Sequence, residues 1–219
     1  FAYGNFAWNP HADSEKILHT WFKATYGADD GVPEVKTFLQ RMLGSWRTYE
    51  KYTTPLGVGF MVTPHFHYGP SIEGYEFSRW GTYHRANREG IGIDRTVATG
   101  TGYAGLYPEA LASLYENPHT CPDDLLLFFH HVPYDFELHR GTTVLQDIYN
   151  HHFEGYDEAV LQAEAWDELE GFLPQKDFQN GRERFARQLD NAREWRDQIN
   201  TYFYRFTGIP DEQGRTIYP

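Results

Sequence analysis

The sequence is poor in cysteine, in long apolar runs and in basic residues. Its single cysteine, Cys121, excludes a disulfide within the chain and agrees with a reducing compartment. No run of about 18 apolar residues is present, and the opening residues FAYGNFAWNP lack the charged start and apolar centre of a signal peptide. We therefore expect a cytoplasmic protein that does not span a membrane. Lys and Arg number 19 against 31 Asp and Glu, and the net charge of -12 argues against nucleic-acid binding.

Aromatic residues, by contrast, are abundant. The chain contains 6 Trp, 16 Tyr and 16 Phe, which make up 17% of its residues, and 40% of all residues are hydrophobic. This supply is sufficient for a real core in a chain of 219 residues. Rigid aromatic rings also serve interfaces and the surfaces on which sugars stack. The composition predicts a folded protein whose aromatic residues serve packing and binding.

Helix signals predict a mainly α fold. Asp13 is placed to cap a first helix and Gly27 to end it, and Pro33 opens a second helix that should pack on the first. Further along, Gly155 is expected to interrupt a long helix, and Gly208 ends the last one. The predicted helices cover residues 13–26, 33–52, 120–132, 142–172 and 175–206.

The middle of the chain, about residues 53–107, is the exception, because it has neither a helical nor a strand period. Structureless connections longer than about 15 residues are uncommon in compact domains. This irregular segment is rich in aromatic residues and glycine, and it contains the basic stretch SRWGTYHRANREGIGIDRT at residues 78–96. We expect it to pack beneath the helices or against a neighbouring domain. The aromatic opening of the chain indicates a fragment of a larger protein and favours the second alternative.

Carboxylates in the irregular segment do not have the spacing of a glycosidase pair. Each has an arginine nearby in the sequence, so ion pairing is the preferred interpretation. These residues are Glu73, Glu76, Glu89 and Asp94. Asp123 and Asp124, which precede an apolar run, are interpreted as acids at a helix start, where the helix dipole favours them.

Histidines and the cysteine do not form a recognisable site. His65 and His67 would project to one side of an extended chain, but no third metal ligand is evident. The neighbours His130 and His131, and likewise His151 and His152, are expected on helices with their rings about 100° apart, which favours buried hydrogen-bonding roles. Cys121 is interpreted as a buried thiol. We predict neither a metal nor another cofactor.

Long strings in the sequence resemble the C-terminal domain of the α-glucuronidases of glycoside hydrolase family 67. They are NFAWNP, YEFSRWGTYHRANREGIGIDRT, YENPHTCPDDLLLFFHHVPY, HHFEG and AREWRDQINTYFYRFTGIPDEQGRTIY. The resemblance covers essentially the whole chain. It implies that a small N-terminal α/β domain and a (β/α)8 barrel precede this region. Residues 1–219 would then form a single helical C-terminal domain, with residues 1–12 as the junction after the barrel, and the irregular segment would pack on the barrel.

The resemblance also implies an activity. Family members hydrolyse, with inversion, the α-1,2 bond between 4-O-methyl-glucuronic acid and the terminal xylose of xylo-oligosaccharides. Inversion requires one protonated carboxyl and one or two carboxylates that activate water. In the family these groups lie on the barrel, and no segment here matches the barrel's motifs. We therefore predict no catalytic residue in this chain and no activity for the chain alone.

The basic stretch is the predicted substrate-binding region. Trp80 would lie against a sugar face at the mouth of the barrel, and arginine suits a uronic acid because its planar fork matches a carboxylate. Burial of Trp80 in the barrel interface is the alternative. For Arg79, Arg85, Arg88 and Arg95 the alternative is ion pairing that fixes the loop. The predicted substrate-binding residues are Arg79, Trp80, Tyr83, His84 and Arg85.

The resemblance further implies a homodimer formed through this domain. Exposed aromatic residues beside the inner stripe of the last helix, such as Tyr202, Tyr204 and Phe206, would suit that contact. The predicted partners are thus a glucuronoxylo-oligosaccharide, the barrel of the same protein and a second copy. An independent carbohydrate-binding or structural helical module remains the alternative function.

Overall fold

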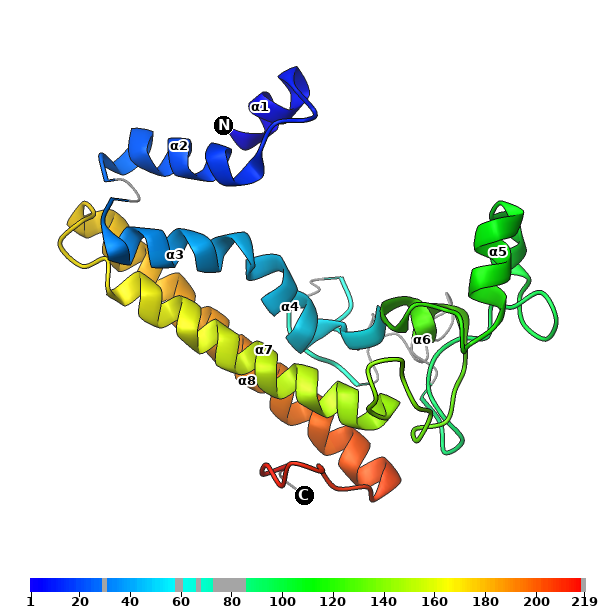
Figure 1. Ribbon diagram of the computed structural model, residues 1–219. Coiled ribbons are helices and arrows are strands. Elements are labelled where there is room, and N and C mark those ends of the chain that lie inside the picture. The colour runs from blue at the N-terminus through cyan, green and yellow to red at the C-terminus, as the bar shows by residue number, and fades with distance from the viewer. Residues whose placement is uncertain (29–30, 58–60, 66–67, 73–85, 218–219) are drawn as a thin grey trace. The chain divides into compact units, whose positions relative to one another are not determined.

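The computed structural model describes residues 1–28, 31–57, 61–65, 68–72 and 86–217, and these residues are mainly helical (Figure 1). The α-helices are α1 (Ala2–Trp8), α2 (Ser14–Tyr26), α3 (Pro33–Leu43), α4 (Ser45–Thr53), α5 (Glu109–Glu116), α6 (Leu126–Phe129), α7 (Val144–Asp167) and α8 (Gln175–Thr207). Short 3-10 helices are η1 (Pro55–Gly57), η2 (Tyr103–Leu106) and η3 (Asp123–Leu125). The extended pairs found in the described residues are isolated bridges, Val62 with Pro70, Ile91 with Val132 and Glu137 with Thr143. The predicted mainly α fold is confirmed.

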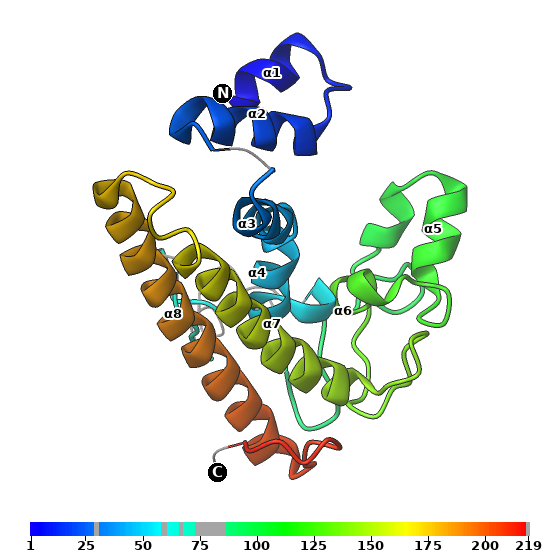
Figure 2. The ribbon, with the colours of Figure 1, turned by 60° about the vertical axis from the view of Figure 1, so that its left-hand side comes forward.

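The chain divides into two compact units, and each is made of two separate stretches of sequence. Unit 1 consists of Phe1–Tyr49 and Asp157–Asp190, and unit 2 of Glu50–Tyr156 and Asn191–Pro219. Helices α7 and α8 contribute residues to both units. They run antiparallel and side by side (Figures 1 and 2), with Trp166 against Phe185 in unit 1 and Tyr156 against Arg196 in unit 2.

Helix α2 has the boundaries that the sequence predicts. The Asp13 carboxylate accepts the backbone N–H groups of Glu15 (2.9 Å) and Lys16 (3.1 Å), which would otherwise lack partners in the first turn. At the other end Gly27 adopts the left-handed conformation with φ 72°. A residue with a side chain would be strained there, so the glycine ends the helix.

Aromatic rings form the core of unit 1. The ring centroids of Phe22 in α2 and Phe38 in α3 are 6.0 Å apart, which confirms that the first two predicted helices pack together. Phe38 in turn meets Trp166 of α7 at 5.2 Å, and Trp166 donates its indole N–H to the Phe178 carbonyl at 3.0 Å. Gly181 makes this packing possible, since a Cβ there would lie 2.1 Å from the Trp166 ring.

The helix predicted over residues 33–52 is two helices, α3 and α4, with Gly44 between them. The Gly44 N–H bonds the Arg41 carbonyl at 3.1 Å, three residues back, so the α-helical ladder tightens at this point. Helix α4 is held on its inner side by Thr48, which donates to Glu158 (2.9 Å) and accepts from Gln162 (2.9 Å).

The interruption predicted at Gly155 is wrong, because α7 runs unbroken from Val144 to Asp167. The glycine serves a close approach between helices instead. A Cβ at position 155 would lie 2.7 Å from the backbone nitrogen of Tyr52 and 3.0 Å from Cβ of Lys51, both in α4. The side chain of Lys51 also pairs with Glu154 at 3.1 Å beside this contact.

The helix predicted over residues 120–132 is also shorter than expected. Only η3 and the single turn of α6 are helical there, and His130 is already extended, with φ -129° and ψ 145°. The chain leaves the helix because Val132 pairs with Ile91: each backbone N–H donates to the other residue's carbonyl, at 2.9 and 3.0 Å. This tertiary pairing overrides the local helical preference.

Residues that follow α8 are held against the first turns of α7 in unit 2. Gln146 donates to the Pro210 carbonyl (2.8 Å) and accepts the Glu212 N–H (2.9 Å), while the Tyr149 hydroxyl donates to the Ile209 carbonyl (3.0 Å).

Among the residues described, none of the helices combines the length and the hydropathy required to cross a membrane.

Candidate substrate-binding region

All of the predicted substrate-binding residues fall within residues 73–85, which lie outside the described residues: Arg79, Trp80, Tyr83, His84 and Arg85. Their roles stay predictions, as do the ion pairs predicted for Glu73 and Glu76. The described chain on either side, which ends at Ile72 and resumes at Ala86, is well anchored.

The chain before Ile72 is attached to α8. The Tyr68 carbonyl accepts two side-chain donors from that helix, the Asn191 amide at 3.0 Å and the Trp195 indole N–H at 3.3 Å. Backbone hydrogen bonds of 2.8 Å also join residues 61–63 to residues 69–71, from Thr63 N–H to the Gly69 carbonyl and from Ser71 N–H to the Met61 carbonyl. These contacts fix the approach to residue 73.

The chain after Ala86 is attached just as firmly. The Asn87 side chain accepts the Gly90 N–H at 3.0 Å, and the Tyr134 hydroxyl donates to the Asn87 carbonyl at 2.9 Å. Gly90 and Ile91 lie directly against Val132, where a Cβ on Gly90 would come within 2.0 Å of the Val132 carbonyl oxygen. The described part of the irregular segment therefore packs on other parts of this chain, as the first of the two alternatives expected.

Arg95 holds the end of the basic stretch in place. Its backbone N–H donates to the Phe129 carbonyl at 2.9 Å. Its guanidinium donates to the Phe128 carbonyl and lies over the Phe128 ring, with Cζ 4.0 Å from the ring centroid. These contacts help to fix this part of the chain, and the ion pair of the alternative stays a prediction.

The ion pair predicted for Asp94 is wrong. Its carboxylate accepts the hydroxyls of Thr96 (2.6 Å) and Thr99 (2.7 Å) and the Thr96 N–H (3.0 Å), and within the described residues it has no arginine partner. Burial raises the pKa of Asp94, but these hydrogen bonds outweigh burial and bring it below its ordinary value. Glu89 and Arg88 are exposed.

The histidines next to α6 have hydrogen-bonding roles, as predicted, but they do not lie on a helix. His130 Nε2 is 2.8 Å from the Tyr115 carbonyl and His131 Nδ1 is 2.9 Å from the Gly92 carbonyl. Burial lowers the pKa of His130. The His130 ring thus joins the end of α6 to α5, and the His131 ring joins it to the loop at Gly92.

His151 and His152 do lie on a helix, α7. His152 Nδ1 is 2.7 Å from the Ile148 carbonyl, and burial lowers the pKa of His152 to about 4, which keeps the ring neutral. His151 Nδ1 pairs with Asp147 at 2.8 Å. The described residues contain no group of three or more His, Cys, Asp or Glu side chains arranged around a metal position. His65 is described, whereas His67 is not, so the predicted HxH pair is untested.

Asp123 stands in the first turn of η3, as predicted, and also organises a charged cluster that we call the Asp123 cluster. Its carboxylate pairs with His139 Nδ1 (2.7 Å) and Arg140 Nε (3.2 Å), while Arg140 also pairs with Asp124 (2.9 Å) and Asp147 (3.5 Å). Burial raises the pKa of Asp123, but the hydrogen bonds from His139 and Arg140 outweigh burial and lower it. The sequence did not reveal the cluster, because His139, Arg140 and Asp147 lie 16 or more residues after Asp123.

Cys121 is buried and 0% exposed, as predicted. Burial, with a smaller contribution from the charge of Asp123, raises the pKa of its thiol to about 11. The thiolate, which is the nucleophilic form, is therefore scarce at neutral pH.

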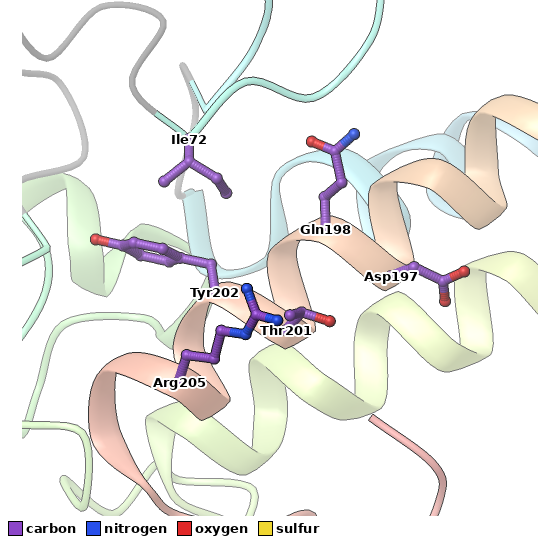
Figure 3. A pocket seen from close by; sticks show the side chains of 6 residues that line it. All are labelled: Ile72, Asp197, Gln198, Thr201, Tyr202 and Arg205. Atoms are coloured by element: carbon purple, nitrogen blue, oxygen red, sulfur yellow. The ribbon is translucent and has the colours of Figure 1, made fainter. Parts of the chain in front are cut away.

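A surface pocket of about 400 Å³ lies beside Ile72, at the point where the described chain stops (Figure 3). The other described residues of its lining lie on one face of α8: Asp197, Gln198, Thr201, Tyr202 and Arg205. We call it the α8 pocket. Tyr202 was predicted only as an aromatic residue of a dimer contact. The i, i+4 spacing of Gln198, Tyr202 and Phe206 was the available signal that one helix face carries ring and polar groups together.

Two charged residues, Asp197 and Arg205, line the pocket. Asp197 is paired with Arg196, with Oδ1 2.7 Å from Nη2 and 2.8 Å from Nε. Arg205 has no carboxylate partner within the described part of the chain, and its side chain is exposed. Figure 3 shows its guanidinium rising beside Tyr202 toward Thr201. The pocket thus joins one unpaired cation to an aromatic ring and neutral polar groups.

Comparison with known proteins agrees with this picture. Residues 1–216 match the model for "Glycosyl hydrolase family 67 C-terminus". Over 216 residues the chain is 41% identical to alpha-glucuronidase A of Aspergillus tubingensis and 40% identical to the probable alpha-glucuronidase A of Aspergillus niger. Alpha-glucuronidase A of Emericella nidulans is also 40% identical over 216 residues. Each alignment covers 98% of this chain but only 25% of the relative, so the chain spans about a quarter of their length. The chain therefore belongs to the family of glycosyl hydrolase family 67 C-terminal regions.

Proposed function

We propose that this chain is the C-terminal domain of an α-glucuronidase that releases glucuronic acid or its 4-O-methyl ether from xylo-oligosaccharides by hydrolysing the α-1,2 bond. The family match over residues 1–216 is the observation that carries the proposal. It is supported by relatives named alpha-glucuronidase A, which are about four times as long as this chain. A cytoplasmic location, expected from the sequence, is part of the proposal.

The catalytic acid and base belong to the rest of the protein. An inverting glycosidase needs a carboxyl of raised pKa to protonate the leaving oxygen and a carboxylate about 6.5–9.5 Å away to activate water. The described carboxylates of the irregular segment do not meet this need, since Glu89 is exposed and the pKa of Asp94 is lowered. We assign both groups to a (β/α)8 barrel, which the family resemblance places before this region.

This chain would complete the rim of the active site through the basic stretch. Trp80 stacks on a sugar, and Arg79, Tyr83, His84 and Arg85 bind or position its carboxylate and hydroxyl groups. The anchoring on both sides supports this role: the chain is fixed to α8 before Ile72 and to Tyr134 and Val132 after Ala86. Fixed flanking residues lower the entropic cost of binding by the residues between them.

The experiment is a comparison of activity on aldouronic oligosaccharides. The full-length protein should release glucuronic acid, while residues 1–219 alone should not, because the acid and base are absent. Turnover by the purified 219-residue chain would contradict the assignment of catalysis to the barrel. Inactivity of the full-length protein, together with retained xylan binding, would favour an independent carbohydrate-binding module.

Replacing Trp80 in the full-length protein tests the role of the rim. Trp80→Ala should lower kcat/KM several-fold to about tenfold, since aromatic contacts contribute about 0.5–1.5 kcal/mol beyond area burial, and should leave Tm almost unchanged. If Trp80 is instead buried in the barrel interface, the variant loses about 3–5 kcal/mol of stability and melts early with normal kcat/KM. Arg85→Lys is the companion variant, because it keeps the charge but loses the planar fork.

A homodimer is the proposed assembly. Near the end of α8, Phe206 is 36% exposed and stacks on the half-buried Tyr202, while Tyr204 is also half-buried. Rings on a helix surface suit an isologous contact with a second copy. Sedimentation equilibrium should give twice the protomer mass, and Phe206→Asp should shift the equilibrium to monomer. A wild-type monomer at micromolar concentration would exclude this assembly.

A further inference from the structure

The histidines in and beside the Asp123 cluster are placed to hold protons. We propose that the Asp123 cluster, with His151, is a proton-operated clamp. In its closed form the His139 imidazolium fastens the turn at residues 138–142 to η3, while the His151 imidazolium neutralises Asp147 and leaves Arg140 to Asp123 and Asp124. Loss of the two protons loosens this attachment. Neither the family match nor the proposed function assigns a role to these groups.

The hydrogen bonds of His139 match its charged form. Its Nδ1 lies 2.7 Å from Oδ1 of Asp123, and its Nε2 lies 2.9 Å from the carbonyl oxygen of His119. Both oxygens are acceptors, and a neutral imidazole has a single N–H with which to meet them, whereas an imidazolium has two. The ring is also half-exposed, so protons can reach it from the solvent. The geometry therefore favours a proton on each nitrogen of His139.

The Asp123 carboxylate is held in place to receive this ring. Its Oδ1 also accepts the backbone N–H of His139 at 3.1 Å, and its Oδ2 accepts Nε of Arg140 at 3.2 Å. The turn itself is closed by separate backbone hydrogen bonds of 2.9 Å, from Leu138 N–H to the Thr142 carbonyl and from Gly141 N–H to the Leu138 carbonyl. Opening of the clamp should therefore change the attachment of the turn to η3 and leave the turn folded.

His151 binds the second proton, next to a buried carboxylate. Its Nδ1 is 2.8 Å from Oδ2 of Asp147, whose side chain is only 3% exposed. A carboxylate at this depth is costly without a close positive charge, and Nε of Arg140 is farther away, at 3.5 Å from Oδ1. Burial lowers the pKa of His151, but the hydrogen bond and charge of Asp147 outweigh burial and raise it.

The charges of the cluster balance only when both histidines are protonated. With neutral histidines, the three carboxylates of Asp123, Asp124 and Asp147 share one cation, Arg140, which pairs with all three. Two further protons make the positive and negative charges equal. Excess negative charge at high pH therefore repels within the cluster, and protonation relieves that repulsion.

Other titratable groups near the clamp do not supply this response. Glu154, which also raises the pKa of His151, is paired with Lys51 at 3.1 Å. In the tail that packs on α7, Asp211 and Arg215 pair with each other. The next histidine of the helix, His152, faces one acceptor, the Ile148 carbonyl, and its pKa of about 4 keeps it neutral.

The direction of the pH dependence follows from the two raised pKa values. An ordinary histidine titrates near 6.5, and both His139 and His151 are raised above this value in the closed clamp. The contribution of the clamp is therefore complete below about pH 6.5 and is lost as pH rises through the raised values. Each linked proton can change the closing equilibrium by at most about tenfold per pH unit.

Exchange of the imidazole C2 hydrogen in the full-length protein, followed by mass spectrometry, titrates each histidine separately. His139 and His151 should both titrate above 6.5. Asp123→Asn keeps the size of the side chain but removes its charge, so it should lower the pKa of His139. Asp124→Asn is the matched control, since Asp124 is 87% exposed and its printed partner in the cluster is Arg140, and it should leave His139 unchanged.

Amide hydrogen exchange of the same protein reads the attachment itself. After correction for the intrinsic effect of pH, protection in peptides over residues 119–127 and 136–143 should be several-fold greater at pH 6 than at pH 8.5. This difference should disappear in His139→Gln, and peptides from α3 should not show it. The proposal is overturned by a wild-type His139 that titrates at or below 6.5, by local protection that is independent of pH, or by a change that is equal throughout the protein. The wild-type titration decides even where a variant does not fold.

Discussion

Replacing Gly155 by alanine is a sharp test of the packing between α4 and α7. An alanine in the interior of a helix normally stabilises it by about 1 kcal/mol relative to glycine. Here the new Cβ would lie 2.7 Å from the backbone nitrogen of Tyr52, compared with an ordinary contact of about 3.5 Å, so α4 would have to move by roughly 0.8 Å. Overpacking of this kind costs about 1–3 kcal/mol, and we expect the upper half of this range, about 2–3 kcal/mol, because the clashing atom is backbone that cannot rotate away. We therefore expect a net loss of about 1–2 kcal/mol.

Thermal unfolding of the purified protein, followed by circular dichroism at 222 nm, measures this loss. A change of 1 kcal/mol moves Tm by about 2–4 °C in a chain of this size, so Gly155→Ala should melt about 2–8 °C lower than the wild type. Gly4→Ala is the control, because a Cβ on Gly4 of α1 meets nothing within 4 Å and only the helix preference remains. If Gly155→Ala melts at or above the wild-type temperature, the two helices are not in backbone contact at this glycine.

Three further predictions concern titratable groups and metal. Cys121, with a pKa of about 11, should react with a thiol reagent at pH 8 only after unfolding, and a rapid reaction of the folded protein would contradict its burial. Because Asp123 raises the pKa of His139 above 6.5, the pair stabilises the fold below that pH and loses this contribution as pH rises through the raised value. The stability lost in His139→Gln should accordingly be larger at pH 5.5 than at pH 8.5, and a pH-independent difference would refute the pairing. EDTA should leave the far-ultraviolet circular dichroism unchanged, whereas a loss of helicity would revive His65 and His67 as metal ligands.

Local signals allowed much of the helical fold to be predicted. Helix α2 was placed correctly because Asp13 and Gly27 act on their own neighbours in sequence. The last helix was predicted for residues 175–206 and is α8, Gln175–Thr207, since its apolar stripe repeats over many turns. Where such a signal is short, prediction failed: α1 and α5 were missed, and each is only two turns long or little more.

Errors arose where a tertiary contact decides the structure. Gly155 resembles a helix breaker in sequence, and only the proximity of Tyr52 shows that it permits packing. The early end of α6 depends on Ile91, which is 41 residues from Val132 in sequence. Asp94 was expected to pair with an arginine, but the hydroxyls of Thr96 and Thr99 satisfy it within its own loop.

The candidate site was predictable only in part, for the same reason. Residue types identified the basic stretch, and its substrate-binding residues stay predictions. The α8 pocket could not be found from sequence, because it requires Ile72 to lie beside a helix that begins 103 residues later, at Gln175. The availability of Arg205 is likewise a three-dimensional property, set by the pairing of Asp197 with Arg196.

The interleaving of the two units has a consequence for biosynthesis. Neither unit is contiguous, since unit 1 joins Phe1–Tyr49 to Asp157–Asp190 and unit 2 joins Glu50–Tyr156 to Asn191–Pro219. At translation rates of about 5–20 residues per second, the first stretch of unit 1 waits about 5–20 s for the second. During that interval Phe22 and Phe38 have left the ribosome before Trp166 and Phe178, which later cover them, have been made. The nascent chain therefore exposes aromatic surface until Asp157–Asp190 has been made, which makes it a suitable substrate for chaperones that bind apolar segments.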